Sequence, residues 1–136
     1  MEMKASDVLD RWTILEMKSR YNDSAKTELE IYNLEVADLL VSLQDSKKQF
    51  EVICLIVNLM EANSKIWENE SAIRNEFPND PSNTSIPDNP TNEQLIETGR
   101  RTLLIRSYNK LRVQAKTKID QFFNQIPDVK VNHQSQ

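Results

Sequence analysis

The fold is decided by the stretch FEVICLIVNLMEANSKIWENESAIRNE, residues Phe50–Glu76, which begins apolar and ends polar. Its first half, residues 52–60, carries apolar side chains on every side of a helix, a pattern typical of a helix that neighbours enclose. Its second half has four residues at spacings of four, three and four: Asn63, Trp67, Glu70 and Arg74. Those spacings place the four side chains on one line of a helix. We therefore expect one continuous central helix, enclosed in its first half and carrying a polar, aromatic line in its second.

The composition sets the class of protein. The chain has 136 residues, with 17 basic and 21 acidic side chains and a formal net charge of -4. This length suits one domain with a hydrophobic core of its own. The negative balance offers no basic field to a nucleic-acid backbone, so we expect no nucleic-acid partner.

Cysteine use and hydropathy indicate the compartment. The single cysteine, Cys54, has no partner for an intrachain disulfide and lies in the most apolar part of the chain, so we expect it to be buried. The apolar run at 52–60 is too short to cross a bilayer, and no apolar run follows the N-terminal charges. We therefore expect a cytoplasmic protein without a membrane partner.

Glycine and proline predict an all-α fold. Gly99 is the only glycine, and four of the five prolines fall between Pro78 and Pro90. Sheets of this size need glycine-bearing turns, whereas long helices with one proline-rich break do not. We expect a single helical domain over residues 1–127, interrupted by a loop at 77–90, and a flexible tail at 128–136.

Capping patterns predict where the helices begin. Ser6 is expected to cap the first helix, and S-x-x-Q at Ser46–Gln49 and T-x-x-Q at Thr91–Gln94 fit capping boxes for the central and last helices. The last helix can continue to Ile126, before Pro127. A second helix over residues 25–43 is expected to turn the following residues towards the core: Ile31, Leu34, Ala37, Leu40 and Val41. The result is a four-helix, bundle-like arrangement with two long helices and an N-terminal helical hairpin.

Polar residues on three of these helices suggest a binding site. The first helix contributes Asp10, Arg11, Thr13 and Lys18, the central helix contributes the polar line given above, and the last helix contributes Tyr108, Asn109, Arg112 and Lys116. If the helices bring these groups together, guanidiniums, amides, an indole and a phenol would surround an anionic ligand with a flat ring. The alternative is that they form solvated helix edges joined by salt bridges such as Asp10–Arg74 or Glu70–Arg112.

Three segments resemble a known helical family. The segment from Asp10 to Lys18 reads D-R-x-T-I-L-x-x-K, the central helix contains Asn63 and W-x-x-E-x-x-I-R at 67–74, and the last helix carries Tyr108-Asn109, Arg112, Lys116 and Ile119. In these places the chain is similar to an all-helical domain family of unknown function found in bacteria and large DNA phages. The resemblance implies a helical fold and favours a ligand site at the matching polar residues.

We weigh three functions. The first is a non-enzymatic protein that binds a small anionic, nucleotide-derived ligand within or between subunits of a homo-oligomer, analogous to phage proteins that sequester immune signalling nucleotides. The second is a Mg²⁺-dependent all-α nucleotide pyrophosphohydrolase, for which E-V-A-D at 35–38 resembles one half of the carboxylate set. The third is a helical protein-interaction module. The sequence indicates no catalytic residue, no metal ligands and no cofactor.

Overall fold

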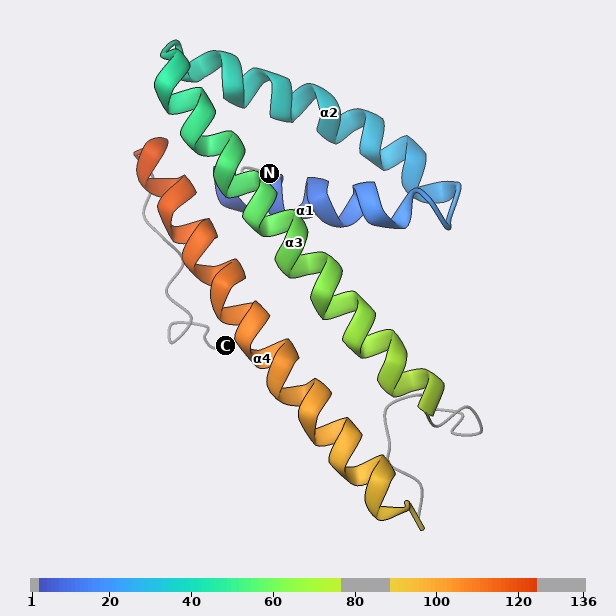
Figure 1. Ribbon diagram of the computed structural model, residues 1–136. Coiled ribbons are helices and arrows are strands. Elements are labelled where there is room, and N and C mark those ends of the chain that lie inside the picture. Colours follow the sequence, from blue (N-terminus) through green and yellow to red (C-terminus); the bar gives the residue numbers. More distant parts are fainter. Residues whose placement is uncertain (1–2, 77–88, 125–136) are drawn as a thin grey trace.

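Four helices make up the computed structural model, which describes residues 3–76 and 89–124. They are α1 (Ala5–Lys18), α2 (Ser24–Leu43), α3 (Ser46–Glu76) and α4 (Asn92–Phe122), and no strand occurs within those ranges. The prediction of an all-α, bundle-like fold is therefore confirmed. The long helices α3 and α4 run side by side and antiparallel. Near one end of this pair α1 crosses α3 and contacts α4, and α2 forms a hairpin with α1 and leads back to the start of α3 (Figure 1).

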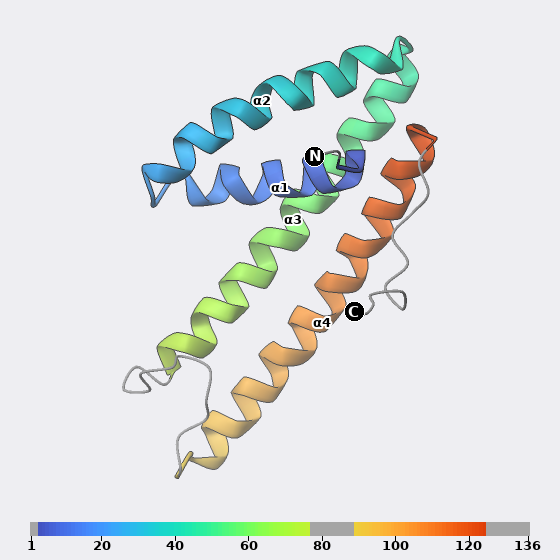
Figure 2. The ribbon, with the colours of Figure 1, turned by 180° about the vertical axis from the view of Figure 1, so that it is seen from behind.

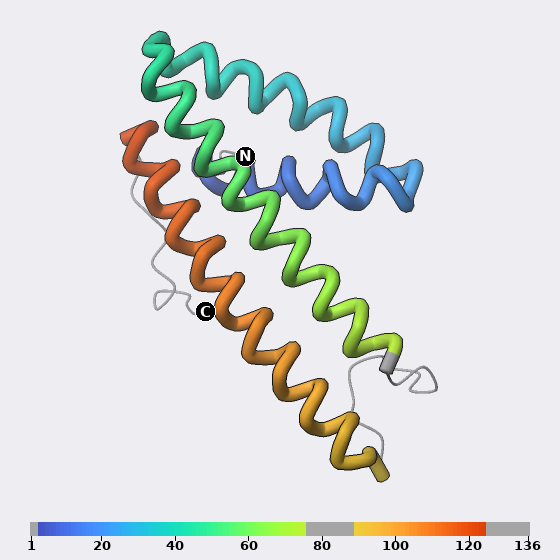
Figure 3. Tube along the Cα trace, in the orientation of Figure 1, coloured from blue at the N-terminus to red at the C-terminus, as the bar shows by residue number. Residues whose placement is uncertain are grey.

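The core lies where the hairpin meets the long helices. All four helices contribute buried apolar side chains to it: Ala5, Val8, Leu9, Val36, Val52, Ile56, Leu59, Ala115 and Ile119. Beyond the hairpin, α3 and α4 continue together as a two-helix arm (Figure 3). Among the described residues, no helix combines the length and the apolar character that a membrane crossing requires.

Helix starts follow the predicted signals at one of three places. Thr91 and Gln94 form the expected capping box, with Gln94 N donating to Thr91 Oγ1 and Thr91 N donating to Gln94 Oε1. The box at Ser46–Gln49 is wrong, because the carboxylate of Asp45 accepts from the backbone N–H of Lys47 at 2.9 Å. The side chain of Gln49 instead donates to the carbonyl of Leu40 and fastens α3 to the end of α2.

The start of α1 is also different from the prediction. Lys4 occupies the N-cap position and its side chain makes no capping hydrogen bond, while Ser6 lies inside the helix. The cap comes from α4: Asp120 Oδ1 accepts from Ser6 N at 3.0 Å, and Asp120 Oδ2 accepts from Ser6 Oγ at 2.7 Å. A carboxylate at a helix N-terminus satisfies free amides and interacts favourably with the helix dipole. Asp120, which is 114 positions from Ser6 in the sequence, therefore caps α1 in place of Ser6.

The predicted inner face of α2 points outwards. Ile31, Leu34 and Val41 are 58%, 71% and 70% exposed, and Ala37 is exposed as well, whereas Leu40 is half-buried. The core side of α2 instead carries Ala25 and Val36, with Tyr32, Leu39 and Leu43 packed against the core. Apolar residues occur on both sides of this helix, so periodicity alone selected the wrong one.

The first half of α3 is enclosed on only one side. Val52, Ile56 and Leu59 are buried, but Ile53, Val57 and the free Cys54 are exposed, contrary to the expectation for residues 52–60. At the other end of the chain, the predicted continuation of the last helix to Ile126 is wrong, because α4 ends at Phe122 and Asn124 has a positive φ of 57°. Most of the predicted loop, at 77–88, and the predicted tail lie outside the described residues.

Replacing Asp120 with alanine tests the cap on α1. We expect Asp120→Ala to lower the free energy of unfolding by about 2–4 kcal/mol, because Ser6 N and Ser6 Oγ each lose their hydrogen bond to a buried carboxylate. Urea unfolding followed by circular dichroism measures this. The matched control is Asp23→Ala at the N-cap of α2, where the carboxylate is 94% exposed and makes no capping bond; its effect should stay within about 0.5 kcal/mol. Equal effects of the two substitutions would contradict the assignment.

Candidate functional site

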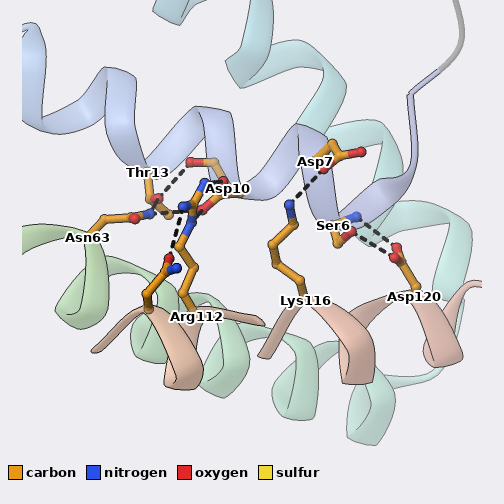
Figure 4. A network of polar contacts seen from close by, with 9 residues as sticks. Ser6, Asp7, Asp10, Thr13, Asn63, Arg112, Lys116 and Asp120 are labelled. Atoms are coloured by element: carbon orange, nitrogen blue, oxygen red, sulfur yellow. Dashed lines mark hydrogen bonds and ion pairs between the residues drawn. The ribbon is translucent and has the colours of Figure 1, made fainter. Parts of the chain in front are cut away.

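A buried polar network joins three helices around Asp10 of α1. Asn63 of α3 donates from Nδ2 to Asp10 Oδ1 at 2.9 Å and to Thr13 Oγ1 at 2.8 Å, and Thr13 Oγ1 donates to the backbone carbonyl of Asp10. From α4, Arg112 donates Nε to Asp10 Oδ1 at 3.0 Å and Nη2 to Asp10 Oδ2 (Figure 4). Asp10, Thr13 and Asn63 are at most 5% exposed. The predicted convergence of polar side chains from three helices therefore occurs here.

The same network extends along the contact between α1 and α4. Arg112, Lys116 and Asp120 follow one another at four-residue spacing on α4, and they meet α1 in reverse chain order (Figure 4). Arg112 binds Asp10, Lys116 Nζ lies 2.8 Å from Asp7 Oδ1, and Asp120 binds Ser6. We call these three pairs the α1–α4 ladder. Its order shows that α1 and α4 pass each other in antiparallel directions in one fixed register.

The charges in the network are compensated. Burial by itself would raise the pKa of Asp10, but hydrogen bonds from Arg112 and Asn63 and the positive charges of Arg112 and Lys116 outweigh it, so the pKa lies below its ordinary value. The hydrogen bond to Asp10 likewise raises the pKa of Arg112. Among the described residues, Thr98 Oγ1 is the one buried side-chain nitrogen or oxygen without a partner, and it lies outside this network. Asp10 and Arg112 therefore each favour the charged form of the other.

Beside the network is a pocket of about 270 Å³ between α1, α3 and α4. Its lining combines apolar and polar side chains, namely Ile14, Met17, Lys18, Asn63, Ile66, Trp67, Glu70 and Arg112. The ring of Tyr21 packs edge-on against Trp67 with a centroid distance of 5.0 Å and an interplanar angle of 82°, which fixes the indole. Asn63 and Arg112 belong to both the network and the pocket, so their orientations are set before any ligand arrives.

Five of the predicted site residues line this pocket, namely Lys18, Asn63, Trp67, Glu70 and Arg112. Asp10 lies behind them and holds Arg112, and Asn109 accepts a long hydrogen bond of 3.4 Å from Arg112 Nη1.

Four other predicted residues are elsewhere. Arg11 pairs with Glu28 of α2 at 3.0 Å, Arg74 donates to Ser71 of its own helix, and Lys116 is in the α1–α4 ladder. Tyr108 lines a separate groove between α3 and α4. The two salt bridges weighed from the sequence, Asp10–Arg74 and Glu70–Arg112, are replaced by Asp10–Arg112.

Sequence reasoning missed part of the network. Ser6, Asp7 and Asp120 were not among the predicted site residues, although Ser6 and Asp120 share a buried contact and Asp7 pairs with Lys116 at a half-buried position. One signal was available: Asp120 follows Ile119 and precedes Phe122 and Phe123 in an apolar segment, and it continues the four-residue spacing of Arg112 and Lys116. An acidic residue in such a segment needs a buried partner.

Carboxylates do not gather in the part of the chain that the structure describes. Within it, no group of three or more His, Cys, Asp or Glu side chains could hold a metal ion. Glu35 and Asp38, which resembled half of a pyrophosphohydrolase ligand set, are both exposed on α2.

Removing Arg112 tests the coupling within the network. We expect Arg112→Met to lower the free energy of unfolding by about 3–5 kcal/mol, because the buried Asp10 loses the cation that is hydrogen-bonded to it. Asp10→Asn combined with Arg112→Met should cost less than the sum of the single substitutions, since no charge then remains unpaired. Urea unfolding of the four proteins gives the double-mutant cycle. Strict additivity would mean that the two side chains do not interact.

Acid should weaken the protein through Asp10. Because its pKa is lower in the folded chain than the unfolded value of about 3.9, its stabilising effect is complete above that pH and is lost as pH falls through the folded pKa. The stability difference between the wild type and Asp10→Asn should therefore shrink below about pH 4. Urea unfolding from neutral pH to about pH 3 measures it, with Asp23→Asn as the exposed control. A difference that stays constant with pH would refute the assignment.

Comparison of the chain with family models, curated proteins and solved structures gives no match in any of the three. The resemblance to the helical family of bacteria and phages therefore stays a prediction. The roles of Asp10, Asn63, Trp67 and Arg112 are argued from their geometry alone.

Proposed function

We propose that the protein is a non-enzymatic binding protein that holds a small anionic ligand with a flat ring in the pocket between α1, α3 and α4. The observation that carries the proposal is the pocket lining, which combines the indole of Trp67 and apolar side chains with Lys18, Asn63 and Arg112. Such a mixture of apolar walls and a few oriented polar groups is typical of small-molecule sites.

The polar groups define what the ligand must offer. Asn63 uses both hydrogens of its amide on Asp10 and Thr13, which leaves its carbonyl oxygen as the acceptor for a ligand donor. Arg112 is held by Nε and Nη2, and its Nη1 makes one long hydrogen bond of 3.4 Å to Asn109, so the remaining N–H of Nη1 can bind a carboxylate or phosphate oxygen. Lys18 at the exposed end of α1 adds a positive charge, and the nearby Glu70 can accept from a hydroxyl or amino group.

Size and charge limit the ligand. About 270 Å³ is slightly below the range of about 300–1,000 Å³ typical of ligand pockets. Asp10 already neutralises Arg112, and Arg74 is not part of the lining. A mononucleotide or smaller molecule with one ring system and one anionic group therefore suits the pocket better than a polyphosphate.

A thermal-shift panel tests this function. Mononucleotides, cyclic mononucleotides, nucleobases and aromatic carboxylates are each added in excess, and a ligand at a hundred times its Kd should stabilise the fold by about 2.7 kcal/mol and raise Tm. The same ligand should change the fluorescence of Trp67, measured in a Trp12→Phe background.

Two lysine variants localise the binding. Lys18→Met should weaken the ligand about tenfold, the equivalent of about 1.4 kcal/mol, without altering the Tm of the free protein, because Lys18 is exposed. The matched control is Lys118→Met, an exposed lysine beside the separate α3–α4 groove, which should leave the affinity unchanged. A panel without any Tm shift, or equal weakening by both variants, would overturn the proposal.

A further inference from the structure

One face of α3 carries apolar side chains that the other described helices leave exposed. Phe50, Ile53 and Val57 are 66%, 45% and 57% exposed, and Cys54 is exposed between them. Their spacing places them on one line of the helix, opposite the buried row that includes Val52 and Leu59. Helix α1 passes behind α3 in Figure 1 and in front of it in the reverse view of Figure 2, so it covers only the other side. We call this line the outer stripe of α3.

The ends of the outer stripe carry opposite charges. Lys47 precedes the apolar residues and Glu61 follows them, and both are exposed. Cys54 lies midway, seven residues from each. At 1.5 Å per residue the two charges are about 21 Å apart along the helix. A stripe with an apolar centre, a positive start and a negative end is complementary to a second copy of itself running in the opposite direction.

We propose that a second copy of this chain docks on the outer stripe, with the two α3 helices antiparallel about a two-fold axis near Cys54. In this arrangement Phe50 packs near the partner's Val57, and Lys47 lies beside the partner's Glu61 at both ends. A parallel arrangement would place like charges side by side. The proposal goes beyond ligand binding, since no residue of the outer stripe lines the pocket.

The surface can extend far enough for a stable dimer. Such interfaces bury about 800 Å² on each partner, which is more than one line of side chains offers. Next to the outer stripe is a groove between α3 and α4, about 160 Å³ in volume, with Leu55, Tyr108 and Leu111 among its lining residues. Leu111 is itself 52% exposed. Side chains flanking the partner's stripe can therefore enter this groove and enlarge the contact.

The first test is the oligomeric state of the full chain, measured by sedimentation across the micromolar range. We expect a dimer, and we expect Val57→Asp to make it monomeric because a carboxylate would enter the apolar contact. The matched control is Leu34→Asp on the outer face of α2, which is 71% exposed and should leave the dimer intact. Circular dichroism confirms that each variant is folded. A wild-type monomer, or a dimer that Val57→Asp does not weaken, would overturn the proposal.

Charge reversal tests the antiparallel direction. Lys47→Glu and Glu61→Lys should each raise the dimer Kd about tenfold, since each places like charges together at both ends. The double reversal restores opposite charges and should return the Kd to near the wild-type value. A double variant as weak as the sum of the two singles would exclude this pairing.

Cys54 reports the position of the two-fold axis. Under oxidation by copper phenanthroline, two Cys54 thiols near the axis lose two protons and two electrons to the oxidant and form one intermolecular disulfide. We expect rapid formation of the covalent dimer in the wild type and at least tenfold slower formation in Val57→Asp. Equal rates in the two proteins would show collision rather than docking and would contradict the proposal.

Discussion

The position of α1 depends on the α1–α4 ladder, in which Arg112, Lys116 and Asp120 meet Asp10, Asp7 and Ser6. In two of the pairs, Asp10–Arg112 and Asp7–Lys116, the acidic residue is on α1 and the basic residue is on α4. In the third pair the acidic residue, Asp120, is on α4 and binds Ser6 in the first turn of α1. A shift of α1 by one turn would leave Asp10 and Asp120 buried without partners, which costs more than any local gain. Apolar packing alone would allow several positions for a helix of this length, whereas the ladder allows one.

Local chemistry explains which features of the fold could be predicted. Helix class and approximate boundaries follow from one glycine, clustered prolines and signals such as Thr91–Gln94, all of which act within a few residues. The side of α2 that is buried could not be predicted, since Leu34 and Val36 are both apolar and only their neighbours in space decide which one is covered. The prediction that Ser6 caps α1 was wrong for the same reason: the cap comes from Asp120, which is remote in sequence and close only in space.

The candidate site was predictable to a similar degree. Spacing along each helix correctly grouped Asn63 with Trp67, whereas the pairs Asp10–Arg74 and Glu70–Arg112 considered from the sequence are replaced by Asp10–Arg112. It could not show where along α3 the short helix α1 crosses. Arg74 is on the same line as Asn63 but lies farther along α3 and does not line the pocket, while Tyr108 lines the separate groove between α3 and α4. Helical periodicity predicts which side of a helix a residue lies on, but it does not predict at which point along the helix another helix makes contact.

The two faces of α3 divide recognition between them. The row that carries Asn63 and Trp67 is held against α1, and its polar groups are fixed by bonds already formed, so a ligand would meet a prepared surface. The outer stripe with Phe50 and Val57 faces away from α1 and has no such fixed partners. No residue of the outer stripe lines the pocket, so the proposed contact between two copies and the proposed ligand site are separate surfaces. Since both surfaces belong to one continuous helix, an effect of ligand on association would have to pass through a displacement of α3 itself. The ladder and Asn63 hold α1 against α3 and α4, and thereby resist such a displacement. We therefore expect ligand binding and self-association to be independent of each other.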